Sequence, residues 1–316
     1  MKFFSAFILL SSLLHAEILY ETDFDDFPIG ANQWGGNDGW ASNDNSSGVQ
    51  SIDADALPAL LNNATLGFQR PNSAFTFVAL NLGYDHLASG APIVEIDTLL
   101  GVEDSTNNRR DDFFLSIYNS TGDRLASIRF DNQLPTALNS QFGIWRENGA
   151  NQFDTQFDFI PGELFNLVAT LDLENNTWSA DIGGIPLFTG QQFTNTNNPV
   201  NLGFVAFEWQ LTSDFTILHG DNFLLVADLI VQSVIEVPEL EVATSFDSSG
   251  QVTLGWETVV GWDDQVQYSA DLTTWLDDLP DSTFENVTNA TAVSYSDDSA
   301  DKGPLRFYRV KRSPAR

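Results

Sequence analysis

The chain has 316 residues, no cysteine and a formal net charge of −31. The lack of cysteine excludes disulfides, thiolate metal sites and thiol nucleophiles, so a sizeable apolar core, including 25 Phe and 8 Trp, must hold the fold. The negative charge disfavours nucleic acid and anionic membranes as partners, because phosphate binding depends on lysine and arginine. We interpret the acidity as a solubility feature, with cation binding or attraction to a basic partner as the alternatives.

The N-terminus has the pattern of a secretory leader. Lys2 precedes an apolar run over residues 3–14, and Ala16 offers a small residue at a cleavage point. The run is too short for a hydrocarbon core of about 30 Å, and no later segment reaches the ~18 apolar residues of a membrane helix. Residues 1–16 are therefore predicted to be a signal peptide, and the mature protein to be secreted or at the cell surface, without a transmembrane segment. An apolar N-terminal strand is the alternative.

Short runs of β-branched and aromatic residues, separated by clusters of Asn, Asp, Gly and Ser, predict an all-β protein. The strands expected in the first two-thirds of the chain are 18–24, 94–100, 113–118, 124–130, 165–173, 177–182, 185–188, 201–209 and 222–232. The clearest hairpin is 113–130, where strict alternation flanks a turn at residues 119–123. A short helical turn is considered only around residues 53–61.

A domain boundary is predicted where Val237 and Pro238 interrupt the strand pattern. Residues 17–235 would form one domain, 236–240 a linker and 241–316 a second domain. Shorter strands are expected there at 241–246, 251–258, 266–270, 292–296 and 306–312, and their spacing fits a small immunoglobulin-like or fibronectin-like sandwich. All basic residues after the boundary lie between Lys302 and Arg316. We favour the solvated face of a last strand over a basic tail that docks on an anionic polymer.

The first predicted domain resembles concanavalin A-like or laminin-G-like jelly rolls of exported proteins from environmental bacteria. The resemblance is carried by the opening run 20–25, the central hairpin 171–178 and the closing run 220–226. It implies an N-terminal jelly-roll sandwich, and it specifies a fold rather than an activity.

The second predicted domain is similar to fibronectin type III modules. The similarity is carried by the runs 252–256, 266–275 and 306–310. It implies a small C-terminal sandwich with Trp256, Tyr268 and Tyr308 in its core, and a role in attachment or spacing.

The jelly-roll resemblance makes glycoside hydrolysis the enzyme hypothesis. Laminarinase-like enzymes of this fold carry their carboxylates on one strand as Glu-x-Asp-x-Glu or Glu-x-Asp-x-x-Glu. Residues 95–97 begin that pattern, but Leu99 and Leu100 occupy both positions of the third carboxylate, which leaves no acid to protonate the leaving oxygen. His86 and His219 form no recognisable triad or zinc motif. We therefore predict that the protein is not an enzyme.

The candidate ligand-binding residues are Trp34, Trp40, Trp145 and Glu147. Trp34 and Trp40 lie in a turn-rich stretch, and Trp145 stands beside hydrogen-bonding residues, so each could offer a ring to a sugar. Burial as a loop plug is the commoner role for each of these three tryptophans, and stacking on a sugar is the functional hypothesis. The preferred hypothesis is a non-catalytic protein that binds a neutral polysaccharide, surface glycan or matrix polymer through the jelly roll. A glycoside hydrolase or lyase with an atypical site and a purely structural surface protein are the alternatives, and the negative field disfavours an acidic lyase substrate.

A structural calcium is the one cofactor considered. Asp23 and Asp25 on the opening strand could meet Asp221 before the closing strand, because jelly rolls often pair their terminal strands. Hard cations take several carboxylate and carbonyl oxygens, which these positions could supply.

We expect chelation to lower the melting temperature of the protein, because an ion that binds only the folded state stabilises it by mass action. A melting temperature that is unchanged after chelation would contradict the calcium site.

Overall fold

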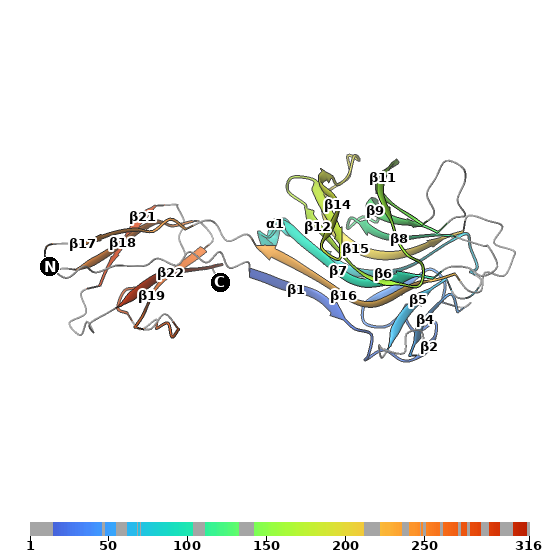
Figure 1. The fold of residues 1–316 in the computed structure, drawn as a ribbon, viewed down its shortest axis with the longest axis horizontal. Coiled ribbons are helices and arrows are strands. Elements are labelled where there is room, and N and C mark those ends of the chain that lie inside the picture. Colours follow the sequence, from blue (N-terminus) through green and yellow to red (C-terminus); the bar gives the residue numbers. More distant parts are fainter. Residues whose placement is uncertain are drawn as a thin grey trace. The chain divides into compact units, whose positions relative to one another are not determined.

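The computed structural model describes residues 15–45, 48–54, 62–67, 69, 71–103, 111–132, 142–211, 222–235, 240–246, 248, 251–259, 262–270, 273–276, 279–285, 291–297 and 306–314. The chain divides into two compact units (Figure 1). The larger unit is Ala16–Ile235, and the described strands of the smaller unit lie between residues 243 and 314. No helix within these ranges has the length and apolar character needed to cross a membrane.

One sheet of the larger unit has nine strands. Its neighbours follow the order β14-β13-β12-β7-β16-β5-β4-β2, and β1 pairs with β16 beside this path. The strands are β1 (His15–Thr22), β2 (Gly30–Ala31), β4 (Gln50–Asp53), β5 (Asn63–Leu66), β7 (Ile93–Val102), β12 (Leu164–Asp172), β13 (Thr177–Ile182), β14 (Ile185–Gln192) and β16 (Leu224–Ile235). The central pair β7 and β16 is antiparallel along the length of β7, from Val102 opposite Leu224 to Ile93 opposite Val234.

The other sheet of the larger unit has seven strands in the order β11-β10-β9-β8-β15-β6-β3. They are β3 (Trp40–Ser42), β6 (Phe75–Tyr84), β8 (Asp112–Tyr118), β9 (Arg124–Asp131), β10 (Gly143–Asn148), β11 (Asn151–Asp158) and β15 (Leu202–Gln210). The chain crosses repeatedly from one sheet to the other, for example between β6 and β7, between β7 and β8, between β11 and β12, and between β15 and β16. These crossings join the two sheets into one sandwich.

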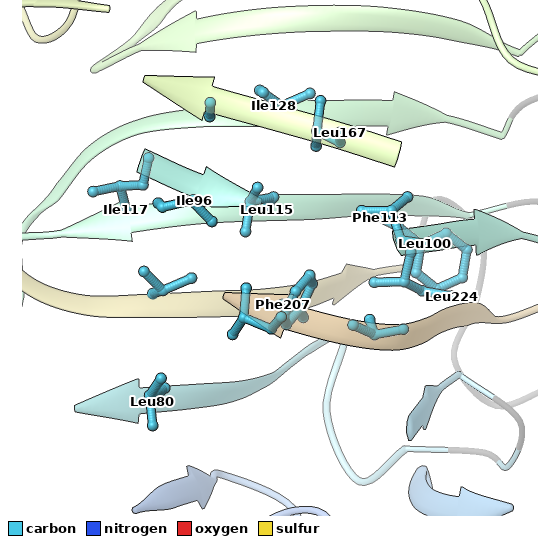
Figure 2. Packing of buried hydrophobic residues seen from close by; sticks show 14 of the residues in the cluster. Leu80, Ile96, Leu100, Phe113, Leu115, Ile117, Ile128, Leu167, Phe207 and Leu224 are labelled. Atoms are coloured by element: carbon cyan, nitrogen blue, oxygen red, sulfur yellow. The ribbon is translucent and has the colours of Figure 1, made fainter. Parts of the chain in front are cut away.

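The apolar core lies between the two sheets, where alternate residues of each strand meet (Figure 2). Phe113, Leu115 and Ile117 of β8 point inward, together with Ile96 and Leu100 of β7 from the opposite sheet. Because strand side chains alternate, the intervening residues of β8 must lie on the outer side of the seven-stranded sheet. That outer side carries the candidate site described below.

A single turn of helix, α1 (His86–Ser89), was not anticipated from the sequence. The Asp85 side chain accepts hydrogen bonds from the backbone N–H groups of Leu87 and Ala88, and Gly90 ends the turn in a left-handed conformation. The helical turn predicted around residues 53–61 lies mostly outside the described residues, and Asp53 itself ends β4.

The smaller unit contains two three-stranded sheets among its described residues. One has the order β17-β18-β21 and the other β20-β19-β22. Their strands are β17 (Ala243–Phe246), β18 (Val252–Glu257), β19 (Trp262–Ser269), β20 (Thr283–Phe284), β21 (Ala292–Ser296) and β22 (Phe307–Pro314). Trp256 and Tyr308 are buried in the core of this unit and Tyr268 packs against it, as predicted. The fibronectin type III resemblance itself stays a prediction.

The described arginines near the C-terminus are held inside the smaller unit. Arg312 pairs with Asp264 at 2.7 Å, Arg306 pairs with Asp297 at 2.8 Å, and Arg309 lies 4.3 Å from the centre of the Trp275 ring. Arg309 and Arg312 lie on the last strand, β22, but Arg312 is 7% exposed, so the expectation of a solvated face is wrong for this residue.

The predicted all-β architecture is confirmed, and the hairpins predicted at 113–130 and 165–182 correspond to β8–β9 and β12–β13. The sequence missed three strands of six or more residues, β6, β10 and β11, and also the shorter strands β2, β3, β4, β5 and β20. Residues 1–14 and 236–239, which contain nearly all of the predicted leader and linker, lie outside the described residues.

The core position of Leu115 can be tested with a matched pair of substitutions. Leu115 is 1% exposed and Leu87 is 80% exposed, and both lie in the larger unit. We expect Leu115→Ala to lower the free energy of unfolding by about 2–5 kcal/mol, because it leaves a cavity. Leu87→Ala should change it by about 0.5 kcal/mol or less. Equal effects in urea unfolding would contradict the core assignment.

Candidate functional site

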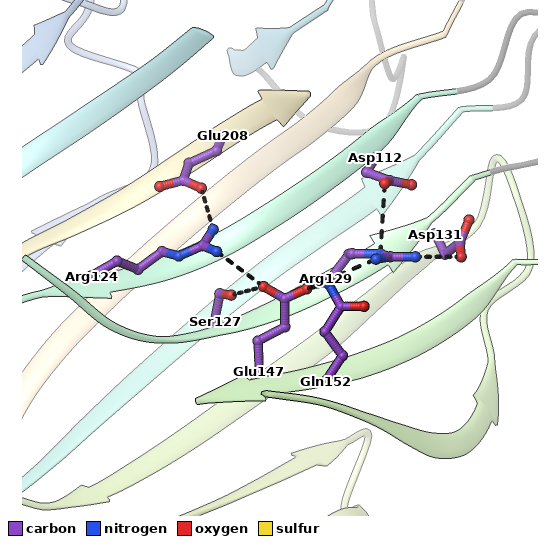
Figure 3. A network of polar contacts seen from close by, with 8 residues as sticks. All are labelled: Asp112, Arg124, Ser127, Arg129, Asp131, Glu147, Gln152 and Glu208. Carbon is purple, nitrogen blue, oxygen red and sulfur yellow. Dashed lines mark hydrogen bonds and ion pairs between the residues drawn. The ribbon is translucent and has the colours of Figure 1, made fainter. Parts of the chain in front are cut away.

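A cluster of charged side chains lies on the outer side of the seven-stranded sheet, across β8, β9, β10 and β15 (Figure 3). We call this surface the charged face and define it by the following residues: Asp112, Tyr118, Arg124, Ser127, Arg129, Asp131, Trp145, Glu147, Gln152 and Glu208. Strand register brings them together. Ser127 of β9 stands opposite Glu147 of β10, and Arg129 stands opposite Trp145.

Arg124 bridges two carboxylates from different strands. Its Nη2 lies 3.2 Å from Glu147 Oε2, and its Nη1 lies 3.4 Å from Glu208 Oε2 (Figure 3). The Ser127 hydroxyl also donates to Glu147 Oε2 at 3.0 Å. The Glu147 and Glu208 side chains are 3% and 0% exposed, so the guanidinium offsets the repulsion between two desolvated anions.

Arg129 links the carboxylates to the aromatic part of the charged face. Its Nη2 donates to Asp131 Oδ2 at 2.7 Å, and its other nitrogens lie 3.7 Å from Asp112 Oδ2 and 3.9 Å from Glu147 Oε1. The guanidinium carbon lies 5.5 Å from the centre of the Trp145 ring, within cation–π distance. The ring is half-buried and keeps part of its surface open to solvent.

Burial controls the protonation of Glu208. Desolvation raises the pKa of Glu208 above its ordinary value, although hydrogen bonding from Tyr118 and the charge of Arg124 act in the opposite direction. Burial also raises the pKa of Tyr118, and the negative charge of Glu208 adds to that effect. The Tyr118 hydroxyl therefore stays protonated and donates to Glu208 Oε1.

Trp145 and Glu147 are the two predicted residues that the structure brings together. They are two positions apart on β10 and thus share the outer side. Gln152 of β11, which stands opposite Glu147 and is exposed, donates from Nε2 to Glu147 Oε1 at 2.9 Å. Glu147 is therefore a fixed element of the network and does not present a free carboxylate.

The prediction of a ligand-stacking surface is wrong for Trp34 and Trp40. Both are core residues, 0% and 3% exposed, with ring centres 5.3 Å apart. Trp34 also packs against Phe24 and Phe207, with ring centres 5.8 and 5.5 Å apart. The turn-rich stretch closes over the sandwich, and its tryptophans fill the space beneath.

The predicted calcium ligands do not form a metal cluster among the described residues. Asp23 Oδ1 accepts from the Asp25 backbone N–H at 3.1 Å, which is a local turn contact. Asp23 also lines a cavity of about 770 Å³ whose wall includes Asp26, Asp38 and Asp228. Asp221 lies outside the described residues, so the calcium site stays a prediction.

Glu95 and Asp97 of the hydrolase-like run lie on the outer side of the nine-stranded sheet, away from the charged face, while Ile96 between them is a core residue. Glu95 Oε1 accepts from the Gln232 amide at 2.7 Å. Burial raises the pKa of Asp97, and nearby Asp228 and Glu95 add to the effect while Asn166 opposes it. Leu99, at a position of the absent third carboxylate, stands opposite Asn166 of β12.

Sequence reasoning missed Arg124, Arg129, Tyr118 and Glu208. One signal was present, because Ser127 and Arg129 alternate with buried Ile128 and Phe130 on β9. Glu208 gave no such signal, since its partners lie 84 and 90 positions away and are found only through the strand register.

Comparisons with known proteins show distant structural likeness only. No family model matches the chain, and no curated protein matches it significantly. A structure named sialidase aligns with 66% of this chain and 18% of its own, at 8% identity and a TM-score of 0.44. Domain 4 of AbnA, an extracellular arabinanase of Geobacillus stearothermophilus, was solved in complex with arabinotriose. It aligns with 71% of this chain and 95% of its own, at 15% identity and a TM-score of 0.40. The carbohydrate recognition domain of Emp47p aligns with 69% of this chain and 96% of its own, at 10% identity and a TM-score of 0.43.

This chain therefore spans less than a fifth of the sialidase chain. Likeness with TM-scores below 0.5 carries no argument about what this chain does.

The raised pKa of Glu208 predicts a pH-dependent stability. Between the unfolded and the folded pKa of Glu208, the folded state binds more protons than the unfolded state, so stability falls as the pH rises through that window. Glu208→Gln keeps an acceptor for Tyr118 and Arg124 but does not titrate. We expect wild type to lose stability relative to Glu208→Gln between about pH 4.5 and about pH 7.

Urea unfolding at both pH values measures this difference. Glu163→Gln, at an exposed position of the larger unit, serves as the control and should track wild type at both values. If the stability of Glu208→Gln changes with pH as much as that of wild type, the burial of Glu208 does not govern its ionisation.

Proposed function

We propose that the protein is an exported, non-catalytic protein that binds a neutral glycan or matrix polymer through the charged face. The observation that carries this proposal is the half-buried Trp145 ring, held under the Arg129 guanidinium and bordered by fixed polar groups. Aromatic rings pack against the apolar faces of sugar rings, while neighbouring amide and carboxylate groups take hydrogen bonds from the hydroxyls.

The polar groups around Trp145 suit a neutral ligand. Gln152 presents an exposed amide beside Glu147, and an amide both donates and accepts hydrogen bonds. The charged face has more carboxylates than guanidinium groups, and the chain carries a net charge of −31. Both features disfavour an anionic ligand at this surface.

Rigidity also supports binding. Arg124 and Arg129 each contact more than one carboxylate, so the groups that surround Trp145 are ordered before any ligand arrives. A preorganised surface loses less conformational entropy on binding. The similar structures, which include a carbohydrate recognition domain, agree with this ligand class but are too distant to argue for it.

The remaining parts of the chain have supporting roles in this proposal. The predicted leader would export the protein to the cell surface or the medium. The smaller unit would act as a spacer or anchor for the larger unit.

A glycoside hydrolase is the second candidate function, because Glu208 and Glu147 contact the same guanidinium and burial raises the pKa of Glu208. A general acid of a glycosidase needs such a raised pKa. Two features favour binding over hydrolysis. The Glu208 side chain has no exposed surface, and Arg124 contacts both carboxylates at the position where a substrate would enter between them.

A glycan array with a reducing-sugar assay on the same panel tests the proposal. We expect wild type to bind at least one neutral glycan without releasing reducing sugar. Trp145→Ala should weaken that binding about tenfold or more, because ring stacking is lost. Release of reducing sugar that Glu208→Gln abolishes would instead support the hydrolase.

Trp275→Ala is the matched control. Trp275 is half-buried and lies 4.3 Å beneath Arg309, but it belongs to the smaller unit. Its substitution should leave glycan binding unchanged. Equal losses in both variants, or no binding to any neutral glycan on the panel, would refute binding through the charged face.

A further inference from the structure

A pocket of about 280 Å³ opens where edge strands of the two sheets of the larger unit meet. β11 ends the seven-stranded sheet and β14 ends the nine-stranded sheet, and the two strands contact each other. Arg146 lines the pocket together with Phe153, Thr155 and Gln156 of β11 and Phe188 and Gln191 of β14. We call this the Arg146 pocket. Because residues alternate along β10, Arg146 lies on the opposite side of that strand from Trp145 and Glu147.

Two aromatic rings hold the Arg146 guanidinium. Its central carbon lies 4.0 Å from the centre of the Phe153 ring and 5.6 Å from that of Phe188. Phe188 is itself anchored against the buried Trp178, with ring centres 4.7 Å apart. The cation–π contacts fix the orientation of the guanidinium and leave its N–H groups to other partners.

Among the described residues, the Arg146 guanidinium has one protein acceptor, the Gln192 carbonyl. Arg146 is only 6% exposed, and its Nη1 donates to the Gln192 carbonyl at a long 3.4 Å. Within the described part of the chain, no carboxylate lies within ion-pair distance of Arg146, whereas ion pairs are formed by Arg124, Arg129, Arg306 and Arg312. Asp154 also lines the pocket, but it does not pair with Arg146, and its Oδ1 accepts from the Gln156 backbone at 2.7 Å.

A buried guanidinium without a counter-ion is costly, since buried charges normally require a partner. Desolvation lowers the pKa of Arg146, and no nearby negative charge acts in the opposite direction. The five N–H donors of arginine match the two oxygens of a carboxylate, so an anionic ligand would supply the missing partner.

We propose that the Arg146 pocket binds the carboxylate of a uronic acid residue in an acidic glycan. Arg146 takes the carboxylate, the Phe153 and Phe188 rings pack against the sugar ring, and Gln156 and Gln191 hydrogen-bond the hydroxyls. The volume lies at the small end of ligand pockets, which run from about 300 to 1,000 Å³, and suits a single ring. Arg146 points away from the charged face, although Asp154 of the pocket stands opposite Trp145 in the register of β10 and β11. The proposal does not depend on the function proposed for the charged face.

The net charge of the protein does not exclude an acidic sugar at this position. Exposed charges farther away than about 10 Å are largely screened at moderate ionic strength, whereas Arg146 would touch the ligand directly. Asp154 is the opposing charge within the pocket. Replacing it with asparagine should therefore tighten binding.

Calorimetric titration of the full chain tests the proposal. The probes are trimers of galacturonate, glucuronate and mannuronate, each with its neutral galactose, glucose or mannose counterpart. At least one uronate trimer should bind, and its neutral counterpart should bind about tenfold or more weakly, since hydrogen bonds between charged groups are lost. Arg146→Met should cause a similar loss, and Asp154→Asn should strengthen binding.

Arg309→Met is the control, because Arg309 also stacks on an aromatic ring but lies in the smaller unit. Arg309→Met should leave the affinity for the uronate trimer unchanged. Trp145→Ala should also leave that affinity unchanged, because it alters the charged face and not the Arg146 pocket. Arg146→Met should melt no lower than wild type, because methionine fills the same space without burying a charge. The proposal is overturned if no uronate trimer binds, if the neutral trimers bind equally well, or if Arg146→Met keeps the affinity.

Discussion

The larger unit depends on one apolar layer between its two sheets. The chain has no disulfide to hold the sheets together, so inward-facing residues such as Leu115, Ile96 and Phe207 must do so by burial alone. The same alternation that directs these side chains inward directs Ser127, Arg129 and Glu208 outward. The core thus determines which residues form the charged face, and the strand register determines how they meet.

The charged face depends on its arginines. Glu208 is fully buried and Glu147 nearly so, although both stand on the outer side of a sheet. Without Arg124, Glu147 would keep only the more distant Arg129 at 3.9 Å, and the Glu208 carboxylate would lose its guanidinium partner, at a cost on the order of several kcal/mol. The guanidinium of Arg129 then extends the order of the network to Trp145. A surface built in this way presents an aromatic ring on a rigid support, and the proposed glycan binding depends on that ring.

Sequence alone predicted the elements with strong local signals. The hairpin β8–β9 follows from alternating Phe113–Tyr118 and a polar turn, and β12–β13 follows from the same logic around Asn175 and Asn176. Trp34 and Trp40 were placed wrongly because turn-forming neighbours suggest exposure, whereas contacts with Phe24 and Phe207 from distant segments bury them. Local composition cannot report such contacts.

The candidate site was only half predictable for the same reason. Trp145 and Glu147 stood out as neighbours in the sequence, but the arginines that give them a role come from β9. The Arg146 pocket needs β14 as well, more than 35 positions away, and in the sequence analysis Arg146 is only a neighbour of Trp145. Long-range register, which no single segment encodes, decides both sites.

The central claim is that a neutral glycan binds the outer side of the seven-stranded sheet. Hydrogen–deuterium exchange, with and without a glycan that binds, tests it directly, because β11 is an edge strand whose outward N–H groups lack a neighbouring strand. We expect slower exchange in β9, β10 and β11 when the glycan is bound. Protection confined to the nine-stranded sheet or to the smaller unit would contradict it.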